Sequence, residues 1–171
     1  AGKEFEKAVE IIKERGWNEE LEGDIDEKVE GIIDSYIHGN DKRLGAMVEV
    51  TCKTDFVAKN EDFRTFVHEV VLQVAAMKPE YVSRESLDEK AIKDLKEKFT
   101  KEVEAEKKPK EMVEKIVEGK LNKYFAEKCL LEQKWFKDES KTIASLLDET
   151  SQKMGEPLKI SRIILWEMGK K

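Results

Sequence analysis

Few side chains in this sequence could carry out covalent chemistry at neutral pH. The candidate general bases are His38 and His68, but no Ser or Cys nucleophile motif, Gly-rich phosphate loop or metal-ligand spacing accompanies them. Cys52 and Cys129 lie in different segments without CxxC or Cys/His spacing, which argues against a zinc site or a disulfide framework. We interpret the histidines as structural or solvated and the cysteines as reduced, buried thiols, with an intersubunit disulfide as the alternative. We therefore expect no catalytic residue, no metal and no cofactor.

The densest candidate for a functional site is VEVTCKTDFVAKN, residues 48–60, where a strand pattern runs into a tight connection and then into an apolar helix. Thr54 or Asp55 is expected to cap that helix, because their oxygens accept hydrogen bonds from its first free N–H groups. Capping does not explain Phe56, a large aromatic residue beside the cap. Its side chain either packs inward or projects outward as a wedge into a partner, and residue chemistry leaves both alternatives open.

Strand patterns precede this segment and close the sequence. Residues 31–38 and 44–52 are rich in Ile, Val, Tyr and Thr and are joined by Gly-Asn-Asp, which predicts a β-hairpin. Residues 158–168 read as a third strand, and the three are expected to form one antiparallel sheet.

Both faces of this predicted sheet are partly apolar. Met47 interrupts the polar side of the second strand, and the third strand is expected to place one set of apolar residues on one side, Ile160, Ile164, Trp166 and Met168, and a second set on the other, Ile163 and Leu165. Helices could cover one face and a second copy of the chain could shield the other, whereas scattered exposed apolar residues are the alternative.

Between the second and third strands, apolar residues recur at helical spacing. A strongly apolar face covers residues 63–75 and ends before Pro79. Residues 87–106 and 109–131 carry two further patterns joined by a charged turn, which predicts a helical hairpin, and a shorter helix is expected over 141–154. The predicted fold class is α+β: a three-stranded antiparallel sheet with helices packed on one face and a helical hairpin insertion.

Length and charge limit the number of domains and the classes of partner that this sequence can have. The 171 residues suit one main domain, and 39% hydrophobic residues in clustered order can build a core despite 41% charged residues. A net charge of −6 argues against direct binding to nucleic acid, which relies on clustered Lys and Arg. No apolar run reaches the roughly 18 residues that cross a bilayer, and no signal-peptide pattern opens the sequence, so no membrane association is expected.

The sequence divides into three expected regions. Residues 1–16 carry one short amphipathic pattern that ends at Gly16, and we interpret them as the remnant of an N-terminal helical module, because an isolated helix of this length is marginal in water. Residues 17–30 are polar and acidic and read as a linker. Residues 31–171 are expected to form the core domain.

The segment EVTCKTDFVAKN resembles the signature of the elongation factor Ts family, which carries Thr-Asp-Phe-Val-Ala followed by Lys or Arg and then Asn or Asp. Three further stretches resemble the same family in the same order: EFEKAVEIIKERG, FVHEVVLQVAAMKPEYVSRE, and LLEQKWFKDESKTIASLL followed by ISRIILWEMG. Residues 88–120 are the least family-like. Thr51 and Lys53 depart from the usual Asn and acidic or Gln residues, and the family's opening Thr-Gly-Ala-Gly and Lys-Lys-Ala-Leu segment is missing.

The resemblance implies a non-enzymatic guanine-nucleotide exchange factor for elongation factor Tu, acting in the cytoplasm as a homodimer that pairs through its sheet. In the family the Thr-Asp-Phe loop reaches the nucleotide site of the GTPase, where the Phe wedges between helices and weakens magnesium and phosphate binding. The implied partner-binding residues here are Thr54, Asp55, Phe56 and Val57. The truncated N-terminal module implies weaker binding and poorer exchange. A helical interaction or chaperone-like protein is the alternative.

Overall fold

The computed structural model describes residues 29–105 and 110–170. The helix expected over residues 1–16, most of the linker expected over 17–30, and the turn at 106–109 lie outside these ranges. Within the described ranges, no helix combines the length and apolar character needed to cross a membrane.

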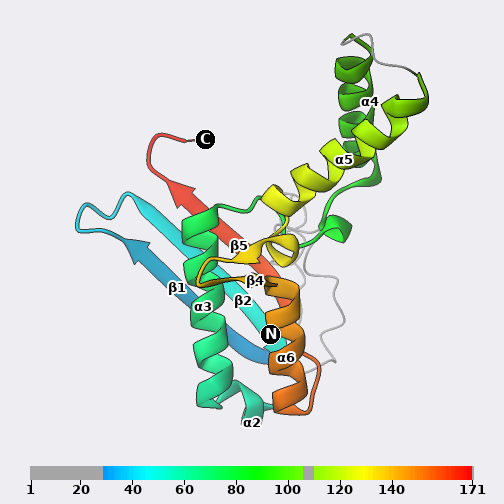
Figure 1. Cartoon of the computed structure of the whole chain (residues 1–171). Helices are drawn as coiled ribbons and strands as arrows, with labels where there is room; N and C mark the ends of the chain where they lie inside the picture. Colours follow the sequence, from blue (N-terminus) through cyan, green and yellow to red (C-terminus); the bar gives the residue numbers. More distant parts are fainter. Residues whose placement is uncertain (1–28, 106–109, 171) are drawn as a thin grey trace, which may run out of the picture.

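The predicted three-stranded antiparallel sheet is confirmed, and strand boundaries agree with the sequence pattern to within a residue or two. Strand β1 (Glu30–His38) pairs with β2 (Leu44–Cys52), which pairs on its other side with β5 (Lys159–Glu167). The sheet order is therefore β1-β2-β5, with the C-terminal strand β5 beside β2, the second strand of the hairpin (Figure 1). This arrangement brings the end of β5 next to the start of β2, and the start of β5 next to the segment that follows β2.

A β-bulge decides which side chains of β5 face the helices. The register between β2 and β5 shifts between Glu49 and Val50, so that Ile163 lies opposite Val48 and Ile160 lies opposite Val50. A bulge inserts one unpaired residue and reverses the alternation beyond it. Ile160 is consequently buried on the face that the helices cover. The prediction that it shares a face with Ile164 and Trp166 was wrong.

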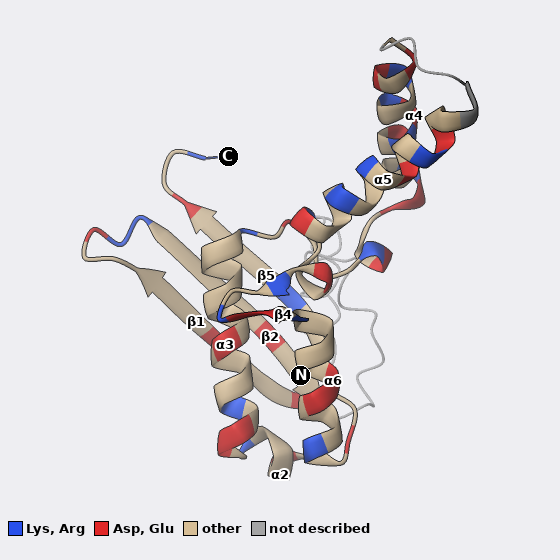
Figure 2. Ribbon diagram, viewed as in Figure 1, with Lys and Arg blue, Asp and Glu red and all other residues tan. Residues whose placement is uncertain are grey.

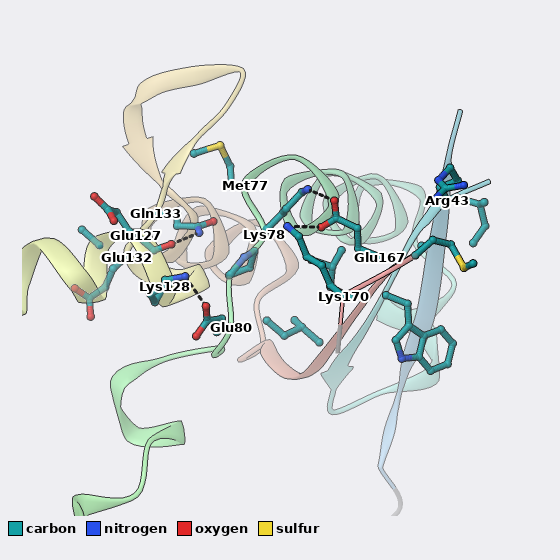
Figure 3. A pocket seen from close by; sticks show the side chains of 18 of the residues that line it. Arg43, Met77, Lys78, Glu80, Glu127, Lys128, Glu132, Gln133, Glu167 and Lys170 are labelled. Atoms are coloured by element: carbon teal, nitrogen blue, oxygen red, sulfur yellow. Dashed lines mark hydrogen bonds and ion pairs between the residues drawn. The ribbon is translucent and has the colours of Figure 1, made fainter. Parts of the chain in front are cut away.

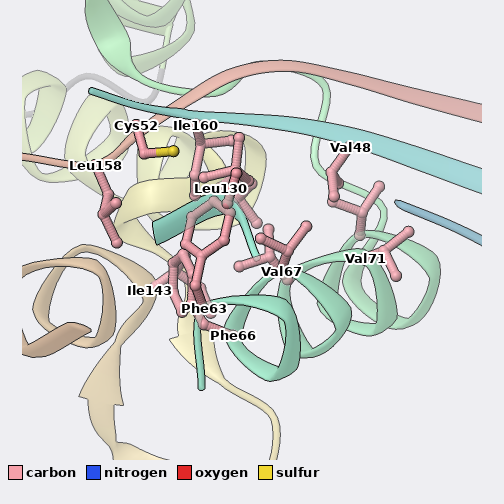
Figure 4. Close-up of a cluster of buried hydrophobic side chains, with 14 of the residues drawn as sticks. Val48, Cys52, Phe63, Phe66, Val67, Val71, Leu130, Ile143, Leu158 and Ile160 are labelled. Carbon is pink, nitrogen blue, oxygen red and sulfur yellow. The ribbon is translucent and has the colours of Figure 1, made fainter. Parts of the chain in front are cut away.

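Two helices cover one face of the sheet, α3 (Glu61–Met77) and α6 (Ile143–Met154). Figure 4 shows the resulting core, in which side chains of α3, the sheet and the start of α6 meet; its labelled members are Val48, Cys52, Phe63, Phe66, Val67, Val71, Leu130, Ile143, Leu158 and Ile160. Each large apolar side chain removed from water in this way contributes about 1.5–3 kcal/mol. The apolar face expected over residues 63–75 is therefore the main packing surface.

The helical hairpin insertion is also present. Helix α4 (Glu89–Ala105) and helix α5 (Lys110–Lys128) lie against each other and extend from the end of the sheet opposite to α2 (Asp55–Ala58) (Figure 1). The hairpin has its own small core, which includes Val103, Val113 and Val117. Figure 2 shows Lys, Arg, Asp and Glu alternating along both helices, as expected for solvated faces.

Several short elements were not predicted. They are helix α2, the 3₁₀ turns η1 (Arg84–Ser86) and η2 (Leu130–Glu132), and the two-stranded sheet of β3 (Lys134–Trp135) and β4 (Asp138–Thr142). Lys141 belongs to β4, so helix α6 begins at Ile143 rather than at Lys141, with Thr142 as its cap and Gly155 closing it. Elements of two to five residues leave too short a pattern for periodicity to reveal.

Candidate functional site

The segment after β2 contains two helices where the sequence predicted one. Thr54 caps the one-turn helix α2, with its Oγ1 accepting a hydrogen bond from the Val57 N–H at 3.4 Å. Asn60 caps α3, with its Oδ1 accepting from the N–H groups of Asp62 at 2.8 Å and Phe63 at 3.4 Å. The expectation that Thr54 or Asp55 caps the long helix was therefore wrong. Each helix has its own cap, and the chain turns between them.

We call residues 54–57 the 54–57 loop; its first three members, Thr54, Asp55 and Phe56, are exposed, and the fourth, Val57, is buried. Phe56 leaves 79% of its surface exposed, whereas Val57 is 5% exposed and packs in the main core. Ala58 is buried beside Val57. Of the two orientations that the sequence left open for Phe56, the structure thus has the outward one, with the adjacent residues anchoring the loop to the core.

Asp55 occupies the exposed first turn of α2 and forms an ion pair along the helix. Its Oδ2 accepts a hydrogen bond from Lys59 Nζ at 2.7 Å, and this bond raises the pKa of Lys59. Both side chains are largely exposed, so such a pair adds little to stability. Asp55 is thus an exposed carboxylate that directly precedes Phe56 in the sequence, and Lys59 partly balances its charge.

Glu156 is a contact of the loop that sequence reasoning missed. Its Oε1 accepts hydrogen bonds from the backbone N–H groups of Lys53 at 2.9 Å and Thr54 at 3.2 Å, and its Oε2 accepts from Thr54 Oγ1 at 3.0 Å. Cys52 Sγ also donates to the Thr54 carbonyl oxygen at 3.3 Å. Burial first, and the nearby Glu156 charge second, raise the pKa of the Cys52 thiol. No local spacing pattern could have identified Glu156, because the contact joins distant parts of the chain.

The other chemistry-bearing residues do not gather into a reactive site. His38 Nδ1 lies 3.0 Å from the Tyr36 hydroxyl, and His68 Nδ1 lies 2.9 Å from Asp34 Oδ2, both at the surface. Cys52 and Cys129 are both buried, as expected. Among the described residues, no three His, Cys, Asp or Glu side chains are placed to hold a metal ion.

An open cavity of about 1430 Å³ lies where the end of β5 faces the C-terminal ends of α3 and α5 (Figure 3). Five of its charged side chains pair with one another. Glu167 accepts from Lys78 and Lys170, each at 2.9 Å, and Lys128 pairs with Glu80. None of the four residues of the 54–57 loop lines it. The cavity is therefore separate from the loop.

The sheet face that the helices leave uncovered carries many apolar side chains together with a Glu49–Arg162 ion pair. We call it the outer face, and its exposed large side chains are Ile33, Ile37, Met47, Ile164, Trp166 and Met168. They come from all three strands and from Met168, which follows β5. Trp166 is the most exposed of the six, with 70% of its surface accessible. Apolar residues contiguous over a sheet face mark an interaction surface more often than isolated ones do. The expectation that both faces of the sheet are partly apolar is confirmed.

These features define the class of protein: an α+β scaffold that displays an exposed aromatic side chain, Phe56, on a turn anchored to the core. The sequence profile of the family described as Elongation factor TS matches residues 6–170. Elongation factor Ts of Acetivibrio thermocellus is 44% identical over 169 residues, 99% of this chain and 78% of the relative. Those of Coprothermobacter proteolyticus and Thermosipho melanesiensis are 44% and 40% identical, over 85% and 86% of their lengths. The chain belongs to the elongation factor Ts family of translation elongation factors.

Proposed function

We propose that this chain is a guanine-nucleotide exchange factor for elongation factor Tu and that the 54–57 loop is its partner-binding element. The observation that carries the proposal is the exposure of Phe56 on a loop that is otherwise anchored. A large aromatic ring with 79% of its surface in water contributes little to folding, but it can contribute much to binding once a partner buries it.

The mechanism is reciprocal linkage between two ligands of the GTPase. If Phe56 wedges into a conformation of the GTPase that holds magnesium and phosphate poorly, the factor and GDP each weaken the other's binding by the same factor. Asp55 adds negative charge beside the wedge. Magnesium is an effective target, because it neutralises the phosphates of the nucleotide. Thr54 and Val57 contribute by holding the loop, one through its cap and the other from the core. This chain supplies no covalent step and no cofactor.

We further propose that two copies of the chain pair through the outer face. A face that carries Ile33, Ile164 and Trp166 in water favours association, because apolar surface is removed from water when two sheets stack. Two identical faces can satisfy each other across a two-fold axis. The 54–57 loop lies beyond the end of the strands, on the side of the helices, so pairing of the outer faces leaves Phe56 accessible.

The proposed setting is the cytoplasm, where the GTPase partner acts. The function requires no contact with nucleic acid or membrane. The acidic net charge of −6 supports the expectation of no direct nucleic-acid contact, because binding to a phosphate backbone draws on clustered cations.

The test is release of a fluorescent GDP analogue from purified elongation factor Tu with no addition, with the parent chain and with Phe56→Ala. We expect the parent to accelerate release and Phe56→Ala to lose most of that acceleration while it keeps its circular dichroism spectrum. Met112→Ala is the matched control, because Met112 is also an exposed apolar side chain but lies on α5. It should exchange like the parent.

Two results would contradict the proposal. A parent chain that binds elongation factor Tu without accelerating release would favour the alternative of a helical interaction or chaperone-like protein. Full activity in Phe56→Ala would leave exchange intact but remove this loop from its mechanism.

A further inference from the structure

The carboxylate of Glu156 lies against the backbone that immediately precedes Phe56. It accepts three hydrogen bonds, from the N–H groups of Lys53 at 2.9 Å and Thr54 at 3.2 Å and from Thr54 Oγ1 at 3.0 Å. A carboxylate is an acceptor only, and its two oxygens suit a concave set of donors of this kind. Bonds to an ionised acceptor are shorter and stronger than those between neutral groups.

The backbone around Glu156 is itself fixed. Gly155 closes α6 in the left-handed conformation at φ 73°, and its N–H donates to the Ser151 carbonyl at 3.0 Å. Pro157 restricts the residue before it to extended conformations. Leu158 is buried, and its N–H donates to Ser151 Oγ at 3.2 Å. The carboxylate is therefore presented from a rigid connection between α6 and β5.

Helix α2 cannot by itself hold the direction of Phe56. It has four residues, and a single turn does not repay the entropy of nucleation. Val57 and Ala58 anchor the C-terminal half of the turn in the core. On the N-terminal side, Cys52 at the end of β2 donates to the Thr54 carbonyl, and Glu156 joins Lys53 and Thr54 to the distant connection between α6 and β5.

We propose that Glu156 is a positioning residue, which fixes the direction in which Phe56 leaves the fold before elongation factor Tu binds. This inference rests on the proposed exchange function. When only a fraction of molecules holds the loop in its binding conformation, the half-saturating concentration rises by the inverse of that fraction. Once the complex has formed, the partner itself holds the loop. Loss of Glu156 should thus raise the half-saturating concentration and leave the maximal exchange rate nearly unchanged.

The test compares Glu156→Ala, Glu156→Gln and the control Glu149→Ala in the full chain. Glu149 is an exposed carboxylate in the middle of α6, and it pairs with Lys141, 2.6 Å away. Hydrogen exchange of the Lys53 and Thr54 amides is measured by NMR on the factor alone, and the rate of GDP release is titrated against factor concentration.

For Glu156→Ala we expect both amides to exchange about tenfold faster and the half-saturating concentration to rise about tenfold, since hydrogen bonds to a charged group are lost. Glu156→Gln keeps an acceptor without the charge and should fall between Ala and the parent. Glu149→Ala should match the parent in both measurements.

Unchanged amide exchange in Glu156→Ala would overturn the inference. Faster amide exchange without a rise in the half-saturating concentration would also overturn it, because the contact would then be structural only. Failure of the proposed function gives a different result, in which the parent chain itself does not accelerate GDP release. The amide measurement requires no GTPase and is unaffected by that failure.

Discussion

The buried amide of Gln73 should be one of the most sensitive positions in the fold. Gln73 lies on the inner face of α3 and is fully buried. Its Nε2 donates to Gln133 Oε1 at 3.1 Å and to the Lys134 carbonyl at 3.0 Å, and its Oε1 accepts from the Phe136 N–H at 3.0 Å. Gln133 in turn donates to the carbonyl of Glu127 at 2.8 Å. This network joins α3, the β3–β4 hairpin and the end of α5.

Replacing Gln73 by Met keeps the length of the side chain and removes all three hydrogen bonds. Each bond contributes about 1 kcal/mol net, and a buried group left without a partner costs about 1–3 kcal/mol. Met recovers part of this through its greater hydrophobicity. We expect Gln73→Met to lower the free energy of unfolding by about 3 kcal/mol, a large share of the roughly 5–15 kcal/mol that keeps a domain folded.

The assay is equilibrium unfolding in urea, followed by circular dichroism at one protein concentration. Gln152→Met on the exposed side of α6 is the matched control, and it should stay within about 0.5 kcal/mol of the parent, as surface substitutions usually do. A loss below about 1 kcal/mol for Gln73→Met would refute the reasoning, because such a loss is no larger than that of a single ordinary hydrogen bond.

Three further predictions concern backbone space, pH and assembly. Gly31 has φ +154°, and a Cβ there would lie 2.3 Å from the Val50 carbonyl oxygen, so Gly31→Ala should lower the free energy of unfolding by about 2–4 kcal/mol. Gly119 is in an open helical position, so Gly119→Ala should raise the free energy of unfolding by about 0.5–1 kcal/mol. Unfolding in urea measures both. Burial raises the pKa of the Cys129 thiol from 9.0 to about 11, so the thiol ionises at lower pH in the unfolded chain than in the folded one. The resulting contribution to the free energy of unfolding is present below pH 9 and is lost as the pH rises toward 11. Cys129→Ala should remove that part of the pH dependence of the unfolding free energy. Trp166→Glu should convert the proposed dimer to a monomer in sedimentation velocity, and an unchanged sedimentation coefficient would contradict pairing through the outer face.

The parts of the fold that the sequence predicts are those with a long, regular pattern. Alternation over nine residues in β2 and a continuous apolar face in α3 are strong signals, because many positions report the same period. Ile160 shows where this reasoning stops. A bulge changes the phase of alternation by one residue, and nothing in the composition of β5 indicates where the phase changes.

The candidate site is predicted only in part, for a related reason. The residue types in the 54–57 loop are visible in the sequence, but the direction of Phe56 is not, because either packing or exposure suits an aromatic residue beside a cap. Asn60 is a good capping residue by type. The structure is needed to show that the helix breaks at Lys59, so that Asn60 caps α3 and Thr54 caps α2. Glu156 is invisible to local patterns, because its contacts with Lys53 and Thr54 cross more than half of the chain.

The position of Phe56 shows how folding and binding can be separated within a single turn of helix. Phe56, the residue that we propose to bind the partner, is adjacent to the buried Val57, so its exposed ring gains a fixed direction without contributing to the core. The two supports of this turn come from different sources, since Val57 belongs to the core and Glu156 belongs to the connection before β5. A substitution that weakens the core should therefore reduce stability and exchange together. A substitution at Glu156 should reduce the affinity for the GTPase while the core stays intact, and this difference is what distinguishes a positioning contact from a packing contact.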